Sequence, residues 1–226
     1  MKNKIGINDH FEKNKNKRKI AIIAIILIAL IISIYFFIKI NYKNKNLGNN
    51  MSNKNIEEIE EYILNISSYQ AKLEITVESN KNTNKYVVEQ TYKKDSMAKQ
   101  TVLEPSNIEK MEMIYENNTL KINNIKINLT TVYENYPYIV DNFLWLDSFI
   151  ADYKEGKQTN SATLIEENGN IIMETKTRNE NNRYVYHKKL YIDKKTGKPT
   201  KLFVQDINKK NLVYILYNEI TVNGLR

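Results

Sequence analysis

The sequence predicts an α+β protein in which a strongly curved antiparallel sheet of about 10–11 strands is covered by two helices and preceded by one transmembrane helix. Three observations predict it. Residues 20–38 form an uncharged apolar run, residues 71–222 contain many short segments of alternating polarity, and two segments show helical spacing instead. We expect an unclosed β-barrel, because so many sequential strands form a wide sheet with one apolar face that needs a cover.

The apolar run 20–38 has the length of a membrane anchor. Its 19 residues would span about 28 Å as a helix, close to the roughly 30 Å hydrocarbon core of a bilayer. Four basic residues precede it closely and are expected to stay in the cytoplasm: Lys15, Lys17, Arg18 and Lys19. We therefore predict a single-pass protein of the cell membrane whose C-terminal domain lies outside the cytoplasm.

A cleaved signal peptide is the competing interpretation of this run. The length of the run and the residues after it distinguish the two. A signal peptide has a shorter apolar core of about 7–15 residues and a small-residue cleavage site. Neither feature is present, and a lipoprotein signal needs a cysteine, of which the chain has none. The predicted organisation is a cytoplasmic tail (1–19), an anchor (20–40), a polar tether (41–54) and an extracytoplasmic domain (55–226).

The first helix of the domain is predicted over residues 55–66. Asn55 can cap it, and Glu58 stands three residues further on, as in a capping box. Isoleucines at helical spacing from Ile56 to Ile66 form one apolar face, which must pack on another element.

Strands follow, because the period changes to two at residue 71. The predicted strands are 71–78, 85–93, 97–104, 110–116, 119–123, 125–133, 161–167, 170–178, 183–193, 200–206 and 211–222. A second helix is predicted at 137–153, where Pro137 suits a first turn and apolar residues recur at helical spacing.

Composition excludes most enzyme classes. Without cysteine there is no thiol nucleophile or thiolate metal site, and the two histidines are far apart in sequence. The six glycines are too scattered for a phosphate-binding loop. The net charge of +8 lies entirely in residues 1–50, so the domain is neutral and nucleic acid is not an expected partner. We predict no catalytic residues, no metal and no cofactor.

Three stretches carry a resemblance to known proteins. NIEEIEEYILNISSYQAKLEITVESN, KYVVEQTYKKDSMAKQTVLEP and KKLYIDKKTGKPTKLFVQD are similar to the opening helix, the early strands and the late hairpin of the LolA/LolB lipoprotein-carrier fold. Among these proteins the sequence most resembles the clostridial germination lipoprotein GerS family. The resemblance covers about residues 55–222, and the Lys-, Asn- and Ile-rich composition is typical of an AT-rich genome such as that of clostridia.

The resemblance implies two different functions. GerS-like proteins are non-catalytic partners of a cell-wall (spore-cortex) amidase in sporulation and germination, whereas LolA-like carriers hold lipid acyl chains on their concave face. A transmembrane anchor in place of an acylated cysteine would prevent shuttling between membranes. We therefore expect an accessory partner of an envelope enzyme, with a tethered lipid- or lipoprotein-binding protein as the alternative.

The aromatic segment 137–153 is the candidate ligand or partner surface. Its residues of interest are Phe143, Leu144, Trp145 and Phe149. They either close the sheet as ordinary core residues or line a lipid cleft or a partner-binding edge. Edges of an open sheet can also accept a strand from a partner or from a second copy of the chain. A homodimer is therefore a further candidate assembly.

Overall fold

The computed structural model describes residues 51, 53–136, 144–178 and 181–223. All of them belong to one compact unit, Gly48–Arg226. The predicted tail, anchor and most of the tether, with their topogenic charges Lys15, Lys17, Arg18 and Lys19, lie outside the described residues. In the part of the chain that is described, no helix has the length and apolarity needed to cross a membrane.

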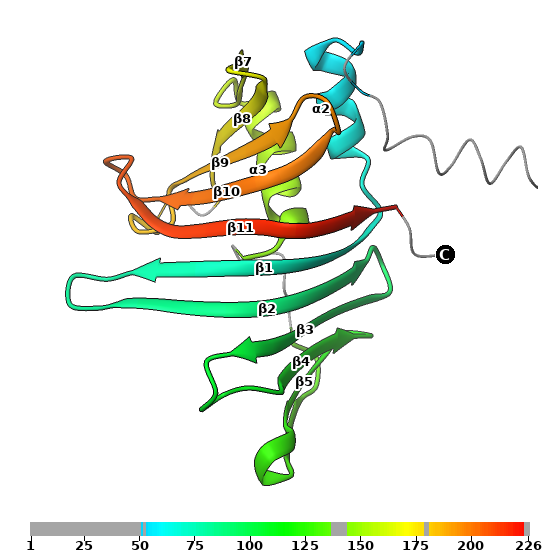
Figure 1. Cartoon of the computed structure of the whole chain (residues 1–226), viewed down its shortest axis with the longest axis vertical. Helices are drawn as coiled ribbons and strands as arrows, with labels where there is room; N and C mark the ends of the chain where they lie inside the picture. The colour runs from blue at the N-terminus through cyan, green and yellow to red at the C-terminus, as the bar shows by residue number, and fades with distance from the viewer. Residues whose placement is uncertain (1–50, 52, 137–143, 179–180, 224–226) are drawn as a thin grey trace, which may run out of the picture. The chain divides into compact units, whose positions relative to one another are not determined.

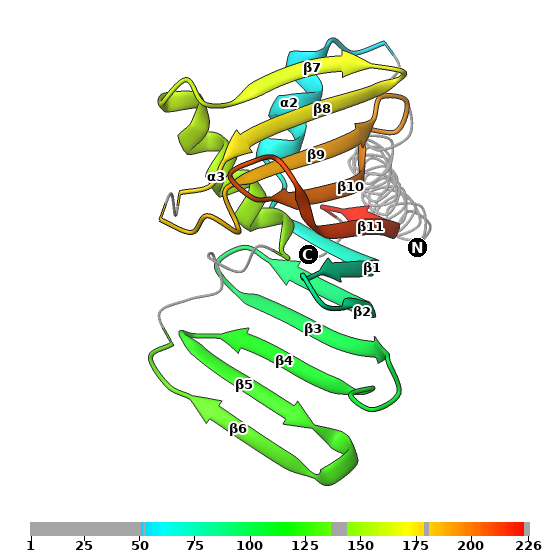
Figure 2. The ribbon, with the colours of Figure 1, turned by 90° about the vertical axis from the view of Figure 1, so that its left-hand side faces the viewer.

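The domain is α+β, as predicted, and contains one antiparallel sheet of 11 strands in the order β6-β5-β4-β3-β2-β1-β11-β10-β9-β8-β7 (Figures 1 and 2). The strands are β1 (Ser68–Glu78), β2 (Thr83–Lys93), β3 (Met97–Glu104), β4 (Met111–Glu116), β5 (Thr119–Asn124), β6 (Leu129–Tyr133), β7 (Thr163–Glu167), β8 (Asn170–Lys176), β9 (His187–Asp193), β10 (Lys198–Gln205) and β11 (Asn211–Val222). The sheet is open, with β6 at one edge and β7 at the other.

The first and last strands pair with each other in the middle of the sheet. β1 and β11 are antiparallel from Tyr69↔Val222 to Val77↔Val213, with a bulge between Lys72 and Leu73. On each side of this pair the strands follow one another as sequential hairpins. Two meanders, β1–β6 and β7–β11, are therefore joined by one long-range strand pair.

Two helices accompany the sheet, as predicted. In α2 (Ile56–Leu64) the predicted capping box is present, because the Asn55 side chain accepts from the Glu58 backbone N–H and the Glu58 carboxylate accepts from the Asn55 N–H. The second helix, α3 (Leu146–Gln158), starts after an N-cap at Trp145. Residues 144 and 145 are not helical, so the predicted continuous helix 137–153 is wrong there; residues 137–143 lie outside the described part.

The helix α3 also continues beyond the predicted end, through Gly156. A Cβ at this position would overlap the Thr175 hydroxyl of β8. Gly156 therefore allows close packing of the helix on the sheet rather than breaking the helix.

The expected strong curvature is wrong: the sheet is neither closed nor strongly curled. The helices have 9 and 13 residues, or about 14 and 20 Å, whereas eleven strands at about 4.8 Å spacing extend roughly 48 Å. Two such helices cannot cover the whole sheet. Part of its inner face therefore has no helical layer around which the strands could curve. Figure 2 shows both helices beside the β7–β10 half and none beside β3–β6.

The predicted strand 125–133 is interrupted. A 3₁₀ turn, η1 (Ile125–Ile127), and a left-handed Asn128 (φ 51°) precede the short strand β6. Asparagine tolerates this conformation, so the strand pattern is broken at the residue best suited to it.

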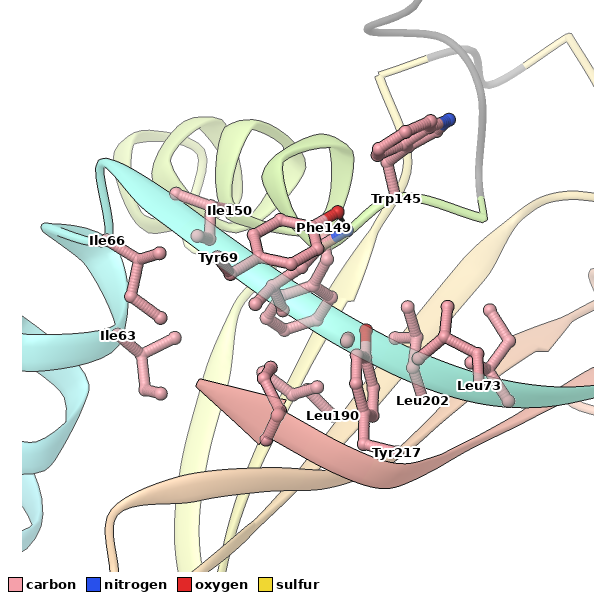
Figure 3. Close-up of a cluster of buried hydrophobic side chains, with 14 of the residues drawn as sticks. Ile63, Ile66, Tyr69, Leu73, Trp145, Phe149, Ile150, Leu190, Leu202 and Tyr217 are labelled. Atoms are coloured by element: carbon pink, nitrogen blue, oxygen red, sulfur yellow. Dashed lines mark hydrogen bonds between the residues drawn. The ribbon is translucent and has the colours of Figure 1, made fainter. Parts of the chain in front are cut away.

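The core lies between the helices and the inner face of the β1, β8–β11 region (Figure 3). Its fully buried residues include Ile63, Leu73, Phe149, Leu190 and Leu202. Met51 joins this core: it is 1% exposed, donates its backbone N–H to the Lys195 carbonyl (2.9 Å), and fills the space beside Gly197 where a Cβ would overlap it. The chain is thus attached to the β9–β10 turn just before α2 begins.

Candidate functional site

The predicted aromatic residues lie where α3 meets the sheet. Trp145 and Phe149 are 1% and 0% exposed, and Leu144 is half-buried; Phe143 lies outside the described residues. The Trp145 ring centroid lies 6.5 Å from that of Tyr69, and the Phe149 and Tyr153 centroids are 5.7 Å apart. In this conformation Trp145 and Phe149 are core residues, as one of the two sequence interpretations has it.

A buried polar chain lies next to this aromatic contact. The Tyr69 hydroxyl donates to Gln90 Oε1 (3.1 Å) and accepts from the Leu146 backbone N–H (3.4 Å). Gln90 Nε2 in turn donates to Gln100 Oε1 (2.9 Å). This chain ties the start of α3 to β1, β2 and β3, and it makes the inner face polar at its centre.

Three buried polar atoms in the same region have no hydrogen-bond partner among the described residues: Trp145 Nε1, Asp147 Oδ1 and the Tyr217 hydroxyl. Burial raises the pKa of Asp147 to about 6, although its own backbone N–H and that of Ser148 lower it. Burial also raises the pKa of Tyr217, and the Asp147 charge raises it further. A negative charge at Asp147 is therefore disfavoured in the folded protein.

Replacing Asp147 with asparagine is expected to remove a pH dependence of stability. The folded carboxyl keeps its proton up to about pH 6, whereas the unfolded one loses it near its ordinary pKa of 3.8, so rising pH destabilises the wild type through that window. The loss is complete above pH 6 and is at most about 3 kcal/mol. Thermal unfolding between pH 4 and 7 should show D147N gaining stability over the wild type as pH rises. Equal pH profiles for D147N and the wild type would contradict the assignment.

An ion network fixes the middle of α3 to the sheet. Lys188 Nζ of β9 lies 2.7 Å from Asp152 Oδ2, and Arg178 Nε lies 2.9 Å from Asp152 Oδ1. Lys188 Nζ also donates to Ser148 Oγ (2.8 Å). The Asp152 and Lys188 side chains are 5% and 2% exposed. Burial lowers the pKa of Lys188, and the Asp152 carboxylate opposes this.

Ser148 and Lys188 have the residue types of a nucleophile and its base. Both side chains are buried, and Lys188 Nζ is also paired with the Asp152 carboxylate, so their contact is part of the ion network that holds α3 on the sheet. A polar pocket of about 320 Å³ lies beside the network, lined by Glu155, Thr159, Ser161, Lys176 and Arg178 among others. Within the described residues there is no group of three His, Cys, Asp or Glu side chains that could hold a metal ion.

An exposed apolar patch lies at the opposite end of the sheet. Nine large hydrophobic residues are exposed in the described part of the chain, and six of them fall between residues 125 and 136. These six are Ile125 (56%), Ile127 (66%), Leu129 (54%), Val132 (48%), Tyr133 (47%) and Tyr136 (37%). We call them the β6 patch. Along β6, Val132 pairs with Lys121 and faces the opposite side of the sheet from Tyr133, which pairs with Leu120, so the patch covers both faces of this edge. Isolated exposed hydrophobics are common, whereas six within one short segment indicate a surface for interaction.

The two edges of the sheet differ in how they are protected. The β7 edge carries Glu166 and Glu167 and packs against α2, whereas β6 reads Leu-Thr-Thr-Val-Tyr, without a charge or a proline, and neither helix of the described part of the chain covers it. Charges and covers are the usual defences of a free edge. The edge that lacks them is the one that carries the β6 patch.

Comparison with known proteins gives the family. A family profile described as sporulation protein YdcC-like matches residues 17–224. No curated protein matches the chain.

Several solved structures are similar to the chain at the level of fold. An uncharacterized conserved protein from Thermus thermophilus is 12% identical, with 75% of this chain and 88% of that chain covered and a TM-score of 0.47. The complex of the CwlD amidase with the GerS lipoprotein from Clostridioides difficile is 24% identical, covering 72% and 91%, with a TM-score of 0.46. The LolA superfamily protein NE2245 from Nitrosomonas europaea is 10% identical, covering 76% and 94%, with a TM-score of 0.37.

These likenesses are too distant to identify a binding surface. The family match, in contrast, spans nearly all of the chain, including the predicted anchor segment. The chain belongs to the YdcC-like sporulation protein family.

Proposed function

We propose that this protein is a non-catalytic, membrane-anchored binding protein that acts outside the cytoplasm during sporulation and supports a cell-wall amidase. The family supports the sporulation role. The amidase is the partner class named for GerS in its complex with CwlD, and it is carried to this chain as a proposal. The anchor rests on the apolar run 20–38 and its basic flank.

The observation that carries the binding role is the β6 patch. A protein with six exposed large hydrophobics within twelve residues, on an unprotected sheet edge, has a surface suited to burial against another protein. The patch also lies far from the point where the chain enters the domain. Met51 is attached at the β9–β10 turn, and seven strand spacings, or about 34 Å, separate β9–β10 from β6.

The alternative function, lipid binding under the helices, has less support from the geometry. Trp145 and Phe149 are packed between α3 and the sheet, and the inner face next to them carries Tyr69, Gln90 and Gln100. An acyl chain would have to displace the aromatic rings and lie against these polar groups, which costs free energy.

Co-purification of the full chain with the sporulation amidase of the same cells, followed by affinity measurement in detergent, tests the proposal. Changing Ile127 and Val132 to aspartate should weaken binding at least tenfold, because charges would enter the apolar contact. The control is Ile207→Asp on the β10–β11 turn, which should leave binding unchanged; Ile207 is 47% exposed, close to Val132 (48%).

Three results would contradict the proposal: no complex with the amidase, equal weakening by I207D, or unaffected binding in the I127D/V132D variant. Acyl chains released from the purified protein on unfolding would favour the lipid alternative instead.

A further inference from the structure

The outer face of the sheet, away from the helices, carries a row of aromatic rings. Tyr191 of β9, Phe203 of β10 and Tyr214 of β11 are half-buried and cross three adjacent strands. Ring centroids are 5.4 Å apart for Tyr191 and Phe203 and 4.6 Å apart for Phe203 and Tyr214. Their neighbours Leu190 and Leu202 point to the core, so strand alternation places the rings on the other face.

Lysines alternate with these rings. In the strand register Lys189 stands opposite Phe203, and Lys201 stands opposite Tyr191. Lys189 Nζ lies 5.5 Å from the Tyr191 ring centroid. Lys176 of β8 lies on the same face, with its Nζ 5.6 Å from the Tyr186 ring. We call Lys176, Lys189, Lys201, Tyr191, Phe203 and Tyr214 the lysine–aromatic face.

The positive charge of this face is not neutralised locally. In the described part of the chain, none of the three lysines has a carboxylate within salt-bridge distance. Of the acids on the same face, Glu174 stands opposite Lys189 in the register but is bound by Lys209 Nζ (2.6 Å). Glu74 is on β1, where it lies opposite Leu216 of β11. Asp193 is the last residue of β9, four residues after Lys189.

A wider charge asymmetry surrounds the face. Residues 176–210 contain eleven Lys and Arg but three Asp and Glu, although the whole of residues 51–226 is balanced. Four of the eleven, Arg178, Lys188, Lys194 and Lys209, are in ion pairs, and Lys188 is buried on the inner face. The others leave a local excess of positive charge on and around β9 and β10, where the rings lie.

We propose that the lysine–aromatic face binds a carboxylate-bearing glycan, the chemistry of the peptidoglycan wall. The C–H-rich faces of sugar rings pack on aromatic rings, whose faces carry partial negative charge. Lysine ammonium groups alternating with those rings pair with carboxylates along the polymer. Aromatic pairs alone would also stabilise a sheet, so it is the unneutralised lysines between the rings that indicate an anionic ligand.

Interleaved lysines and rings also fit a single-stranded nucleic acid. The glycan is favoured because the domain is proposed to lie outside the cytoplasm, and to that extent the inference rests on the proposed function. It uses a different face from the β6 patch, so the two can be tested separately.

Co-sedimentation of the detergent-solubilised full chain with purified insoluble peptidoglycan tests the inference. We expect the wild type to bind peptidoglycan and to bind chitin, an uncharged glycan, at least tenfold more weakly. K189E/K201E should lose at least tenfold in peptidoglycan affinity. The matched control K85E/K93E, which reverses two exposed lysines of β2, should bind as the wild type does.

The inference is overturned if the wild type does not sediment with peptidoglycan, if chitin binds equally well, or if K85E/K93E is as impaired as K189E/K201E. Tighter binding to a single-stranded oligonucleotide than to peptidoglycan would also overturn it. The K189E/K201E variant should still bind the amidase; losing both ligands together would indicate misfolding, which loss of the Trp145 fluorescence signal would confirm.

Discussion

Replacing Asp152 with alanine should lower the free energy of unfolding by about 3–5 kcal/mol, because it leaves the buried Lys188 ammonium without its counter-charge. Arg178 loses the same partner but is 32% exposed, so water can replace the carboxylate there. Urea denaturation of the full chain in detergent measures the change, followed by the fluorescence of Trp145, the single tryptophan.

Two further variants make this prediction specific. Glu166→Ala breaks the ion pair between Glu166 (38% exposed) and Lys194 (27% exposed). This variant should lower the free energy of unfolding by less than about 1 kcal/mol. The double variant Asp152→Ala/Lys188→Met removes both buried charges and should recover part of the loss. An Asp152→Ala variant no less stable than Glu166→Ala would contradict a structural role of the buried pair.

Replacing Phe149 with alanine should cost a similar amount, about 3–5 kcal/mol, because the side chain is fully buried between α3 and the sheet and its removal leaves a cavity. The same denaturation experiment measures it. Tyr214→Ala, which truncates a half-buried ring on the uncovered outer face, is the control and should cost clearly less. Equal losses would mean that the outer rings hold the sheet together as strongly as the core does.

Local sequence signals predict much of this fold. The Asn55–Glu58 capping box and the strand 211–222 are confirmed residue for residue, because both depend on neighbours along the chain. The curvature of the sheet and the start of α3 are wrong for the opposite reason. Each depends on how the helices pack over the sheet, which strand periodicity does not contain.

The functional surfaces show the same division. The sequence singles out Trp145 and Phe149 as aromatic residues of segment 137–153, but the same residue types suit a core and a ligand surface. That both side chains are buried depends on how α3 packs on the sheet, which local sequence does not contain. The Asp152–Lys188 pair is missed because its partners are 36 residues apart and meet only through the packing of α3 on β9. The β6 patch has one signal that could be found: a strand-like segment from Leu129 to Tyr133 without any charge.

The pairing of β1 with β11 has a consequence for how the protein is made. Tyr69 meets Val222, so the central strand pair closes a loop of about 150 residues, and such closure is slow because chain entropy must be lost before the contact forms. During synthesis β1 emerges first and its partner last. Until then the β1–β6 meander keeps a third free edge, next to an apolar inner face. The growing chain therefore passes through an aggregation-prone stage that ends only when its last strand is released.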